Sequence, residues 1–144
     1  MRIVLDTSIL VRATENSRGP ARDLLINVIA QKHELLLSNE MLYELAKVLR
    51  YPRVQAFYGL SEERTYQFIG YLREVAEIVP LSAVFSAPVR DVNDIIVIQT
   101  AVVGEANVLC SGDDDFYDPV TVRFLDKAGI VVTNDVGLLQ RLRS

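Results

Sequence analysis

The fold is decided near the start of the sequence by Ile3-Val4-Leu5-Asp6-Thr7-Ser8, an apolar run that ends in an acid and two hydroxyl side chains. A second apolar run that leads to an acid is Val108-Leu109-Cys110-Ser111-Gly112-Asp113. Short, continuous apolar runs of this kind are typical of strands buried on both faces of a parallel sheet. In such sheets the functional residues lie just beyond the carboxyl ends of the strands. We therefore expect Asp6 and Asp113 to lie at the same edge of one sheet.

Strands and helices are predicted to alternate along the chain. The predicted strands are Arg2–Leu5, Leu35–Leu37, Ile78–Val79, Val108–Cys110 and Ile130–Val132. The predicted helices cover approximately residues 7–11, 20–31, 39–50, 61–75, 91–104, 122–127 and 135–142. Thr7 and Ser8 offer hydroxyl caps to the first helix, no helix is predicted in the polar, aromatic segment Tyr51–Gly59, and Leu81–Val89 is ambiguous. This alternation predicts an α/β fold with a central, mostly parallel sheet of about five strands.

The composition predicts a globular chain. Of its 144 residues, 50% are hydrophobic and 24% are charged, and this length suits a single domain that spans residues 1–144. No apolar stretch approaches the roughly 20 residues of a membrane-spanning helix, so no membrane partner is expected. The N-terminal apolar run stops at Asp6, too soon for a secretion signal. The single cysteine, Cys110, cannot form an internal disulfide, and we expect the protein to reside in the cytoplasm.

The formal net charge of −4 limits how the protein could bind nucleic acid. A protein that attracts nucleic acid through its overall field is normally basic, so a local basic rim or a bound cation would be needed here. The only histidine, His33, excludes mechanisms that need two histidines. A Ser-His-Asp arrangement would have to include His33, whose polar surroundings favour a surface loop. One cysteine and one histidine also exclude a structural zinc site.

Two further regions place acids where a helix meets the sheet or begins. Glu44 lies at the edge of the apolar stripe of its helix, beside Val48, where a carboxylate would be partly sheltered. The alternative is a solvated glutamate paired with Lys47, a contact worth only a few tenths of a kcal/mol. Asp91 and Asp94 lie at the start of another helix, where either could be the cap. One of them can cap the helix while the other faces a cleft.

The turn Gly112–Phe116 contains the consecutive acids Asp113, Asp114 and Asp115. Adjacent like charges repel and contribute no evident stability. Asp113 and Asp115 form the predicted site pair, with Asp114 pointing elsewhere and exposed. A plain acidic turn on the surface is the alternative interpretation.

Other phosphate- and metal-binding motifs do not fit the sequence. An EF-hand that began at Asp113 would need glycine and glutamate where Asp118 and Phe124 stand. No glycine-rich run follows the first strand, which excludes a P-loop and a dinucleotide fingerprint. A response-regulator receiver would carry an acidic pair at the first strand and a lysine near the end of the fifth, where the sequence has Thr133-Asn134.

In chain order, the motifs are Asp6-Thr7-Ser8, Glu44, Arg90-Asp91-x-x-Asp94 and Ser111-Gly112-Asp113-x-Asp115-Phe116. This ordered set resembles the PIN-domain ribonucleases, in particular the toxin-like PIN proteins of bacterial and archaeal toxin–antitoxin operons, and the similarity covers nearly the whole chain. The resemblance implies a three-layer α/β/α PIN-like domain with one or two Mg²⁺ or Mn²⁺ ions in an acidic pocket. It also implies endonucleolytic cleavage of RNA, homodimerisation, and inhibition by a cognate antitoxin protein.

The resemblance also implies roles for individual residues. The positions that match the principal acids, and hence the expected catalytic group, are Asp6, Glu44, Asp94 and Asp113. The expected metal ligands are Asp6, Asp94, Asp113 and Asp115, and the accessory positions are Asp91, Ser8 and Ser111. The sequence departs from many relatives at Asp114, where a basic residue is common. This departure argues against a phosphate contact at the turn and adds to the local repulsion.

The chemistry of phosphodiester hydrolysis independently calls for such a group. The reaction needs an activated water and relief of charge on the phosphoryl oxygens, both of which a divalent cation supplies. Mg²⁺ prefers carboxylates and retained waters. Two carboxylates about 4 Å apart repel by roughly 4 kcal/mol at an effective dielectric of about 20, so a metal-free pocket should be partly protonated. Two other functions stay open: a non-catalytic binding module on the same fold, and a metal-dependent phosphatase.

Three arginines are predicted to line the path of the RNA. Arg12, Arg50 and Arg53 lie near the ends of the elements that carry Asp6 and Glu44. Contacts of this kind to phosphate would make RNA binding depend on salt. The alternative is that all three are solvated surface arginines.

Overall fold

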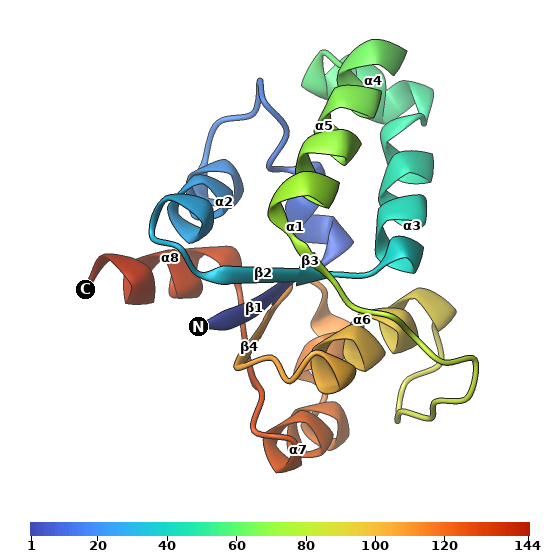
Figure 1. Ribbon diagram of the computed structural model, residues 1–144, viewed down its shortest axis with the longest axis vertical. Coiled ribbons are helices and arrows are strands. Elements are labelled where there is room, and N and C mark those ends of the chain that lie inside the picture. The colour runs from blue at the N-terminus through green and yellow to red at the C-terminus, as the bar shows by residue number, and fades with distance from the viewer.

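The computed structural model describes residues 1–144 and contains one parallel sheet of five strands. The strands are β1 (Arg2–Leu5), β2 (Glu34–Leu37), β3 (Glu77–Ile78), β4 (Val108–Cys110) and β5 (Val131–Thr133). The helices are α1 (Thr7–Val11), α2 (Pro20–Ala30), α3 (Asn39–Leu49), α4 (Pro52–Tyr58), α5 (Glu62–Val75), α6 (Val92–Val103), α7 (Pro119–Lys127) and α8 (Asp135–Arg143), with a 3₁₀ turn, η1 (Asp114–Tyr117). Helices α3 and α5 lie on one side of the sheet and α6 and α7 on the other (Figure 1). The predicted three-layer α/β/α fold class is confirmed.

The strand order β3-β2-β1-β4-β5 puts the first strand in the middle of the sheet. The chain adds β2 and β3 on one side of β1, then crosses over and adds β4 and β5 on the other. The order therefore reverses between β1 and β4, and open α/β sheets bind ligands at such a reversal, beyond the carboxyl ends of the strands. Leu5 pairs with Cys110, and Cys110 pairs with Thr133, so these three strand ends are aligned.

The central strands are buried because helices cover both faces of the sheet. Ile3–Leu5 and Val108–Cys110 are at most 1% exposed. Phe116, in η1, is also completely buried, so it anchors the acidic turn that follows β4 to the core. A membrane-spanning helix is absent, since none of the helices combines the required length with the required hydropathy.

The segment Tyr51–Gly59 contains helix α4, and the expectation that no helix forms there was wrong. Pro52 begins this helix, because a proline ring suits the first helical position. Gly59, with a φ of 61°, ends it in the left-handed region. No residue of α4 is buried. Its apolar side chains Val54, Phe57 and Tyr58 are partly buried or exposed, so the helix lacks the buried apolar stripe of the other helices.

The remaining differences from the predicted elements are small. Helix α7 begins at Pro119 instead of Val122, because the Asp118 carboxylate accepts a hydrogen bond from the backbone N–H of Val120 and caps the helix. Strand β5 begins and ends one residue later than predicted. The ambiguous segment Leu81–Val89 has no regular element.

Gly104 ends α6 against the sheet, and we expect Gly104→Ala to destabilise the fold. A Cβ atom there would lie 2.8 Å from the carbonyl oxygen of Thr100 and 3.0 Å from side-chain atoms of Leu36 and Val79. Overpacking of this kind typically costs about 1–3 kcal/mol. Gly70, within α5, has no atom within 4 Å of the same Cβ position, so Gly70→Ala should stabilise the protein by about 0.5–1 kcal/mol.

Urea denaturation of the two variants beside the native protein measures both changes in the free energy of unfolding. A Gly104→Ala protein as stable as the Gly70→Ala protein would contradict the tight packing described for the end of α6.

Candidate metal centre

Asp6 follows β1 at the strand reversal and is 5% exposed. It occupies the N-cap position of α1, but its side chain makes no capping hydrogen bond. Its carboxylate instead accepts hydrogen bonds from the hydroxyls of Thr7 (3.3 Å), Ser8 (3.0 Å) and Ser111 (2.7 Å). The expectation that Thr7 and Ser8 cap α1 was therefore wrong. A buried carboxylate needs hydrogen-bond donors, and these hydroxyls hold Asp6 in one orientation.

Ser111 connects the ends of β1 and β4. Its fully buried hydroxyl donates to Asp6 and accepts a hydrogen bond from the backbone N–H of Asp113 at 3.0 Å. The Asp113 carboxylate in turn accepts a hydrogen bond from the backbone N–H of Asp115 at 3.0 Å. The Tyr117 hydroxyl donates to the Ser111 carbonyl at 2.8 Å. One serine thus holds the acid after β1 and orients the turn that presents two more acids.

Helix α6 brings a further carboxylate to the same place. Asp91 is exposed and caps the helix by accepting a hydrogen bond from the backbone N–H of Asn93 at 2.8 Å. Asp94, three residues later, is 8% exposed and faces the turn after β4. The sequence allowed either acid to cap the helix. In the structure Asp91 caps it, and Asp94 joins the acidic group.

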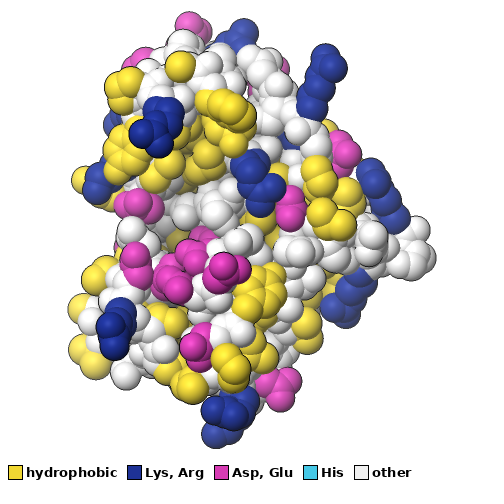
Figure 2. Space-filling view, turned by 180° about the vertical axis from the view of Figure 1, so that it is seen from behind, with side chains coloured by type: hydrophobic (Ala, Val, Ile, Leu, Met, Phe, Trp, Pro, Cys, Tyr) yellow, Lys and Arg dark blue, Asp and Glu magenta, His cyan; other side chains and the backbone are white.

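Asp94, Asp113 and Asp115 form a group of three carboxylates, whose nearest oxygens all lie within 4.8 Å of one another. A cavity of about 640 Å³ opens beside them, and its lining includes Asp94, Asp115, Asp91 and Tyr117. Figure 2 shows acidic side chains gathered in a hollow on one face of the molecule, with hydrophobic and basic side chains above it. Two distant segments, α6 and the turn after β4, thus present negative oxygens to one accessible space.

This arrangement raises the pKa of Asp94 from 3.8 to about 7. The causes, in decreasing order, are burial and the negative charges of Asp113, Asp91, Asp6 and Asp115. Near neutral pH Asp94 is therefore protonated in about half of the molecules, and a bound cation would displace that proton. This agrees with the expectation that a metal-free acidic pocket takes up protons.

The chemistry of the donor set fits a hard divalent cation. Only carboxylate oxygens converge in the group, whereas sulfur and imidazole ligands are typical of zinc. Cations that prefer carboxylates and retain several waters need open space beside the acids, and the adjoining cavity provides it. A cation would also offset the repulsion among the three carboxylates.

Glu44 lies outside the group of three carboxylates. It is half-buried on α3, and together with Asn93 and Ile96 of α6 it lines a separate cavity of about 450 Å³. It forms no ion pair with Lys47. Because Asn93 precedes Asp94 on α6, Glu44 faces the same helix turn that carries the buried acid.

Two of the three arginines predicted to line an RNA path have acidic partners. Arg12 pairs with Asp135 at 2.8 Å, and Arg50 pairs with Glu62 at 2.7 Å. Arg53 is exposed and forms no ion pair. The Arg50 pair is exposed on both sides and contributes little, so its guanidinium remains open to other anions.

Asp135 was not among the predicted site residues, although it lies at the same edge of the sheet. It is 7% exposed and begins α8 just after β5. Asp135 closely follows a predicted strand, as Asp6 does, and this shared pattern in the sequence could have identified it. The Arg12 guanidinium pairs with its carboxylate, so Asp135 is neutralised by the protein itself.

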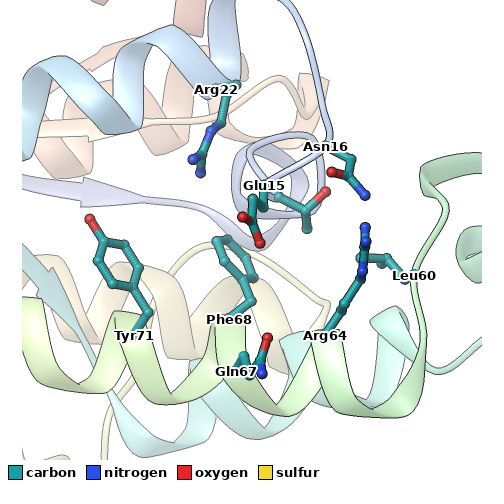
Figure 3. A pocket seen from close by; sticks show the side chains of 9 residues that line it. Glu15, Asn16, Arg22, Leu60, Arg64, Gln67, Phe68 and Tyr71 are labelled. Carbon is teal, nitrogen blue, oxygen red and sulfur yellow. The ribbon is translucent and has the colours of Figure 1, made fainter.

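A different cavity, of about 340 Å³, lies between the α1–α2 connection and α5 (Figure 3). Arg22 of α2 and Arg64 of α5 approach it from different sides, and Glu15 lies between them (Figure 3). Glu15 is the only acid in its lining. One carboxylate cannot form a metal site of the kind described above, so this cavity is not the candidate metal centre.

Comparison with protein families agrees with the geometry. The family model described as the PIN domain matches residues 2–115, so the chain belongs to the PIN domain family. The matched region contains Asp6 and all three members of the carboxylate group. No curated protein matches the sequence. PIN domains are generally metal-dependent nucleases, and the acidic group is compatible with that chemistry.

We expect Asp94→Asn to stabilise the metal-free protein above pH 7. The pKa of Asp94 is about 7 in the folded protein against 3.8, so the folded state binds an extra proton between these two values. Stability therefore falls as the pH rises from about 4 to 7. At about 1.4 kcal/mol per pH unit, this loss amounts to roughly 4 kcal/mol once Asp94 is fully charged.

Chemical denaturation in EDTA at about pH 5 and pH 8 measures the effect. Asn removes the buried charge, so the variant should gain stability at the higher pH and lose most of the dependence on pH. Asp23→Asn, on the exposed face of α2, is the control. If the Asp94→Asn protein keeps the full pH dependence, another group carries the proton.

Proposed function

We propose that the protein is a metal-dependent endoribonuclease that hydrolyses RNA phosphodiester bonds with Mg²⁺ or Mn²⁺. The observation that carries this proposal is the convergence of Asp94, Asp113 and Asp115 in one group beside a cavity. Membership of the PIN domain family adds support, because these domains are generally metal-dependent nucleases.

In this proposal the protein's own residues hold the cation and orient what surrounds it. Asp94, Asp113 and Asp115 are the ligands in the three-carboxylate group, and Asp6 adds a fourth carboxylate whose orientation three hydroxyls set. A cation bound there would supply Lewis-acid stabilisation and lower the pKa of a bound water. Glu44 belongs to the proposed catalytic group and approaches α6 from α3.

A polymeric substrate suits the surroundings of the acids. The acidic hollow is open on one face of the molecule, and basic and hydrophobic side chains gather above it (Figure 2). A strand of RNA could lie across this hollow while the cation compensates the local negative charge. Arg53 and Arg50 are then available for phosphate contacts on α4 and at the end of α3.

The expected outcome is cleavage of single-stranded RNA that needs Mg²⁺ or Mn²⁺ and stops in EDTA. Asp94→Asn and Asp113→Asn should each lower the cleavage rate by about 100-fold or more, because each removes a metal ligand; a 100-fold loss corresponds to about 2.7 kcal/mol. Asp114→Asn is the matched control. Asp114 is an exposed neighbour of both ligands but lies outside the three-carboxylate group, so its variant should retain cleavage.

Calorimetric titration of the same variants with Mn²⁺ separates loss of the metal from loss of the fold. Cleavage that survives both ligand substitutions, or EDTA, would refute the metal-dependent mechanism. Turnover of a phosphomonoester without cleavage of RNA would favour the phosphatase. Retained RNA or partner binding with no affinity for Mn²⁺ would favour a binding module.

We further propose that this ribonuclease is the toxin of a toxin–antitoxin pair. The support is the order of the acidic motifs, which resembles that of toxin-like PIN proteins. In this proposal the chain is a single PIN-like domain over residues 1–144 that acts on RNA in the cytoplasm as a homodimer. A cognate antitoxin protein would hold it inactive.

Expression of the protein in a bacterial host should then arrest growth, whereas expression of Asp113→Asn should not. The product of the adjacent reading frame, expected to be a small DNA-binding protein with a disordered tail, should restore growth and co-purify with the toxin. Light scattering should give about twice the 16.2 kDa chain mass. Normal growth with a nuclease that is active in vitro would contradict the toxin role and leave the ribonuclease intact.

A further inference from the structure

A cavity of about 480 Å³, here called the aromatic pocket, lies between α4 and the start of α2. Its lining includes Phe57 and Tyr58 of α4 together with Arg12 and Arg18. The two aromatic rings meet edge-to-face, with centroids 4.9 Å apart and an interplanar angle of 74°. Phe57 is 80% exposed. Most of its ring surface is therefore open to a ligand.

The exposure of Phe57 has no explanation in the packing of the core. Helix α4 buries no residue, so Phe57 does not hold the helix against the sheet. Large apolar side chains left on the surface commonly mark a binding site when they line a concave surface. Phe57 lines such a surface together with polar residues of the α1–α2 connection.

The charge of the aromatic pocket is the opposite of the charge of the metal centre. Arg12 and Arg18 line the pocket, and no acid does. Arg18 is exposed and forms no ion pair, so its full positive charge is available. In a chain with a net charge of −4, this is a local basic site that suits an anionic ligand.

Arg12 joins the aromatic pocket to the candidate metal centre. It follows α1, which begins after Asp6, so the two residues are about 9 Å apart along the helix axis. Arg12 Nη1 donates to Asp135 at 2.8 Å, and Arg12 Nη2 lies 3.3 Å from the place that a Cβ atom on Gly112 would occupy. The guanidinium thus lies between the pocket and the turn that carries Asp113.

We propose that the aromatic pocket binds one unpaired base of the RNA substrate next to the scissile phosphate. The base stacks on Phe57, and Arg18 holds a neighbouring phosphate. This proposal rests on the ribonuclease function proposed above and names its substrate class as single-stranded RNA. Aromatic side chains stack on any base of a single strand, whereas the bases of a duplex are already stacked and paired.

Two observations favour RNA over a protein partner as the occupant. The pocket combines aromatic rings with arginines and lacks acids, the combination by which proteins bind single strands of nucleic acid. The pocket is also separated from the acids of the proposed catalytic site by about the length of α1. A ligand that spans both sites must carry repeated negative charges and flat rings, as RNA does.

The test measures the affinity of a short single-stranded RNA for the full chain by fluorescence anisotropy, in an Asp94→Asn background that slows cleavage by about 100-fold or more. Phe57→Leu should weaken binding by about tenfold, which corresponds to about 1.4 kcal/mol and lies within the range for one lost base stack. Tyr66→Leu is the matched control. Tyr66 is 76% exposed, close to the 80% of Phe57, and lies outside the pocket on α5.

Two further readouts separate stacking from a general loss of affinity. An RNA that carries the fluorescent base 2-aminopurine should be quenched on binding, and Phe57→Leu should abolish that quenching. Arg18→Ala should lower the slope of log affinity against log salt by about one, while Arg141→Ala, on α8, should not. Duplex RNA of the same sequence should bind equally to the native and Phe57→Leu proteins in this background.

Unchanged RNA affinity and quenching in Phe57→Leu would overturn the proposal and leave a protein partner as the occupant. An equal loss of affinity for duplex and single strand would overturn it as well. Phe57 is exposed, so an unchanged melting curve should show that the variant folds. Binding is measured without cleavage, so the two proposals fail separately. RNA affinity that does not change in Phe57→Leu refutes only the pocket, and stacking on a protein whose native form does not cleave RNA refutes only the nuclease.

Discussion

The pairing of β1 with β4 is the constraint on which the candidate metal centre depends. Leu5 and Cys110 are partners in the parallel register, and the backbone N–H of Asp6 donates to the Cys110 carbonyl at 2.9 Å. This pairing places Asp6 beside Ser111, although 105 positions separate them in the chain. The strand order reverses between these two strands, and open α/β sheets bind ligands beyond the strand ends at such a reversal. The acids can therefore face a common opening.

The carboxylates at this edge differ in the partners that compensate their negative charge. Asp6 receives hydroxyl hydrogen bonds, Asp91 caps α6, and Asp135 pairs with Arg12. Asp94 is buried among other negative charges, which raises its pKa to about 7. Burial of a charge is unfavourable unless a partner compensates it. Asp94 is thus a buried acid that a bound proton or a bound cation would stabilise. This property is expected of a metal ligand.

Much of the fold and part of the site were predictable because they follow from local patterns. The buried strands are continuous apolar runs, and the position of Asp6 and Asp113 at strand ends follows directly from those runs. Helix α4 was not predictable in the same way, since its 7 residues are too few for apolar periodicity to identify a helix. The division of roles between Asp91 and Asp94 also stayed open, because a cap and a ligand have the same local sequence.

By itself, the sequence determined the class of fold, the residues at the strand ends and the ordered acidic motifs that place the chain in the PIN domain family. Only the tertiary structure decided which acids meet: Asp94 joins Asp113 and Asp115, Glu44 lines a separate cavity, and Asp135 is neutralised by Arg12. The physical reason is the separation along the chain over which each interaction acts. Apolar periodicity and capping act over a few residues, whereas the distance between two carboxylates depends on how strands and helices far apart in the chain pack against each other.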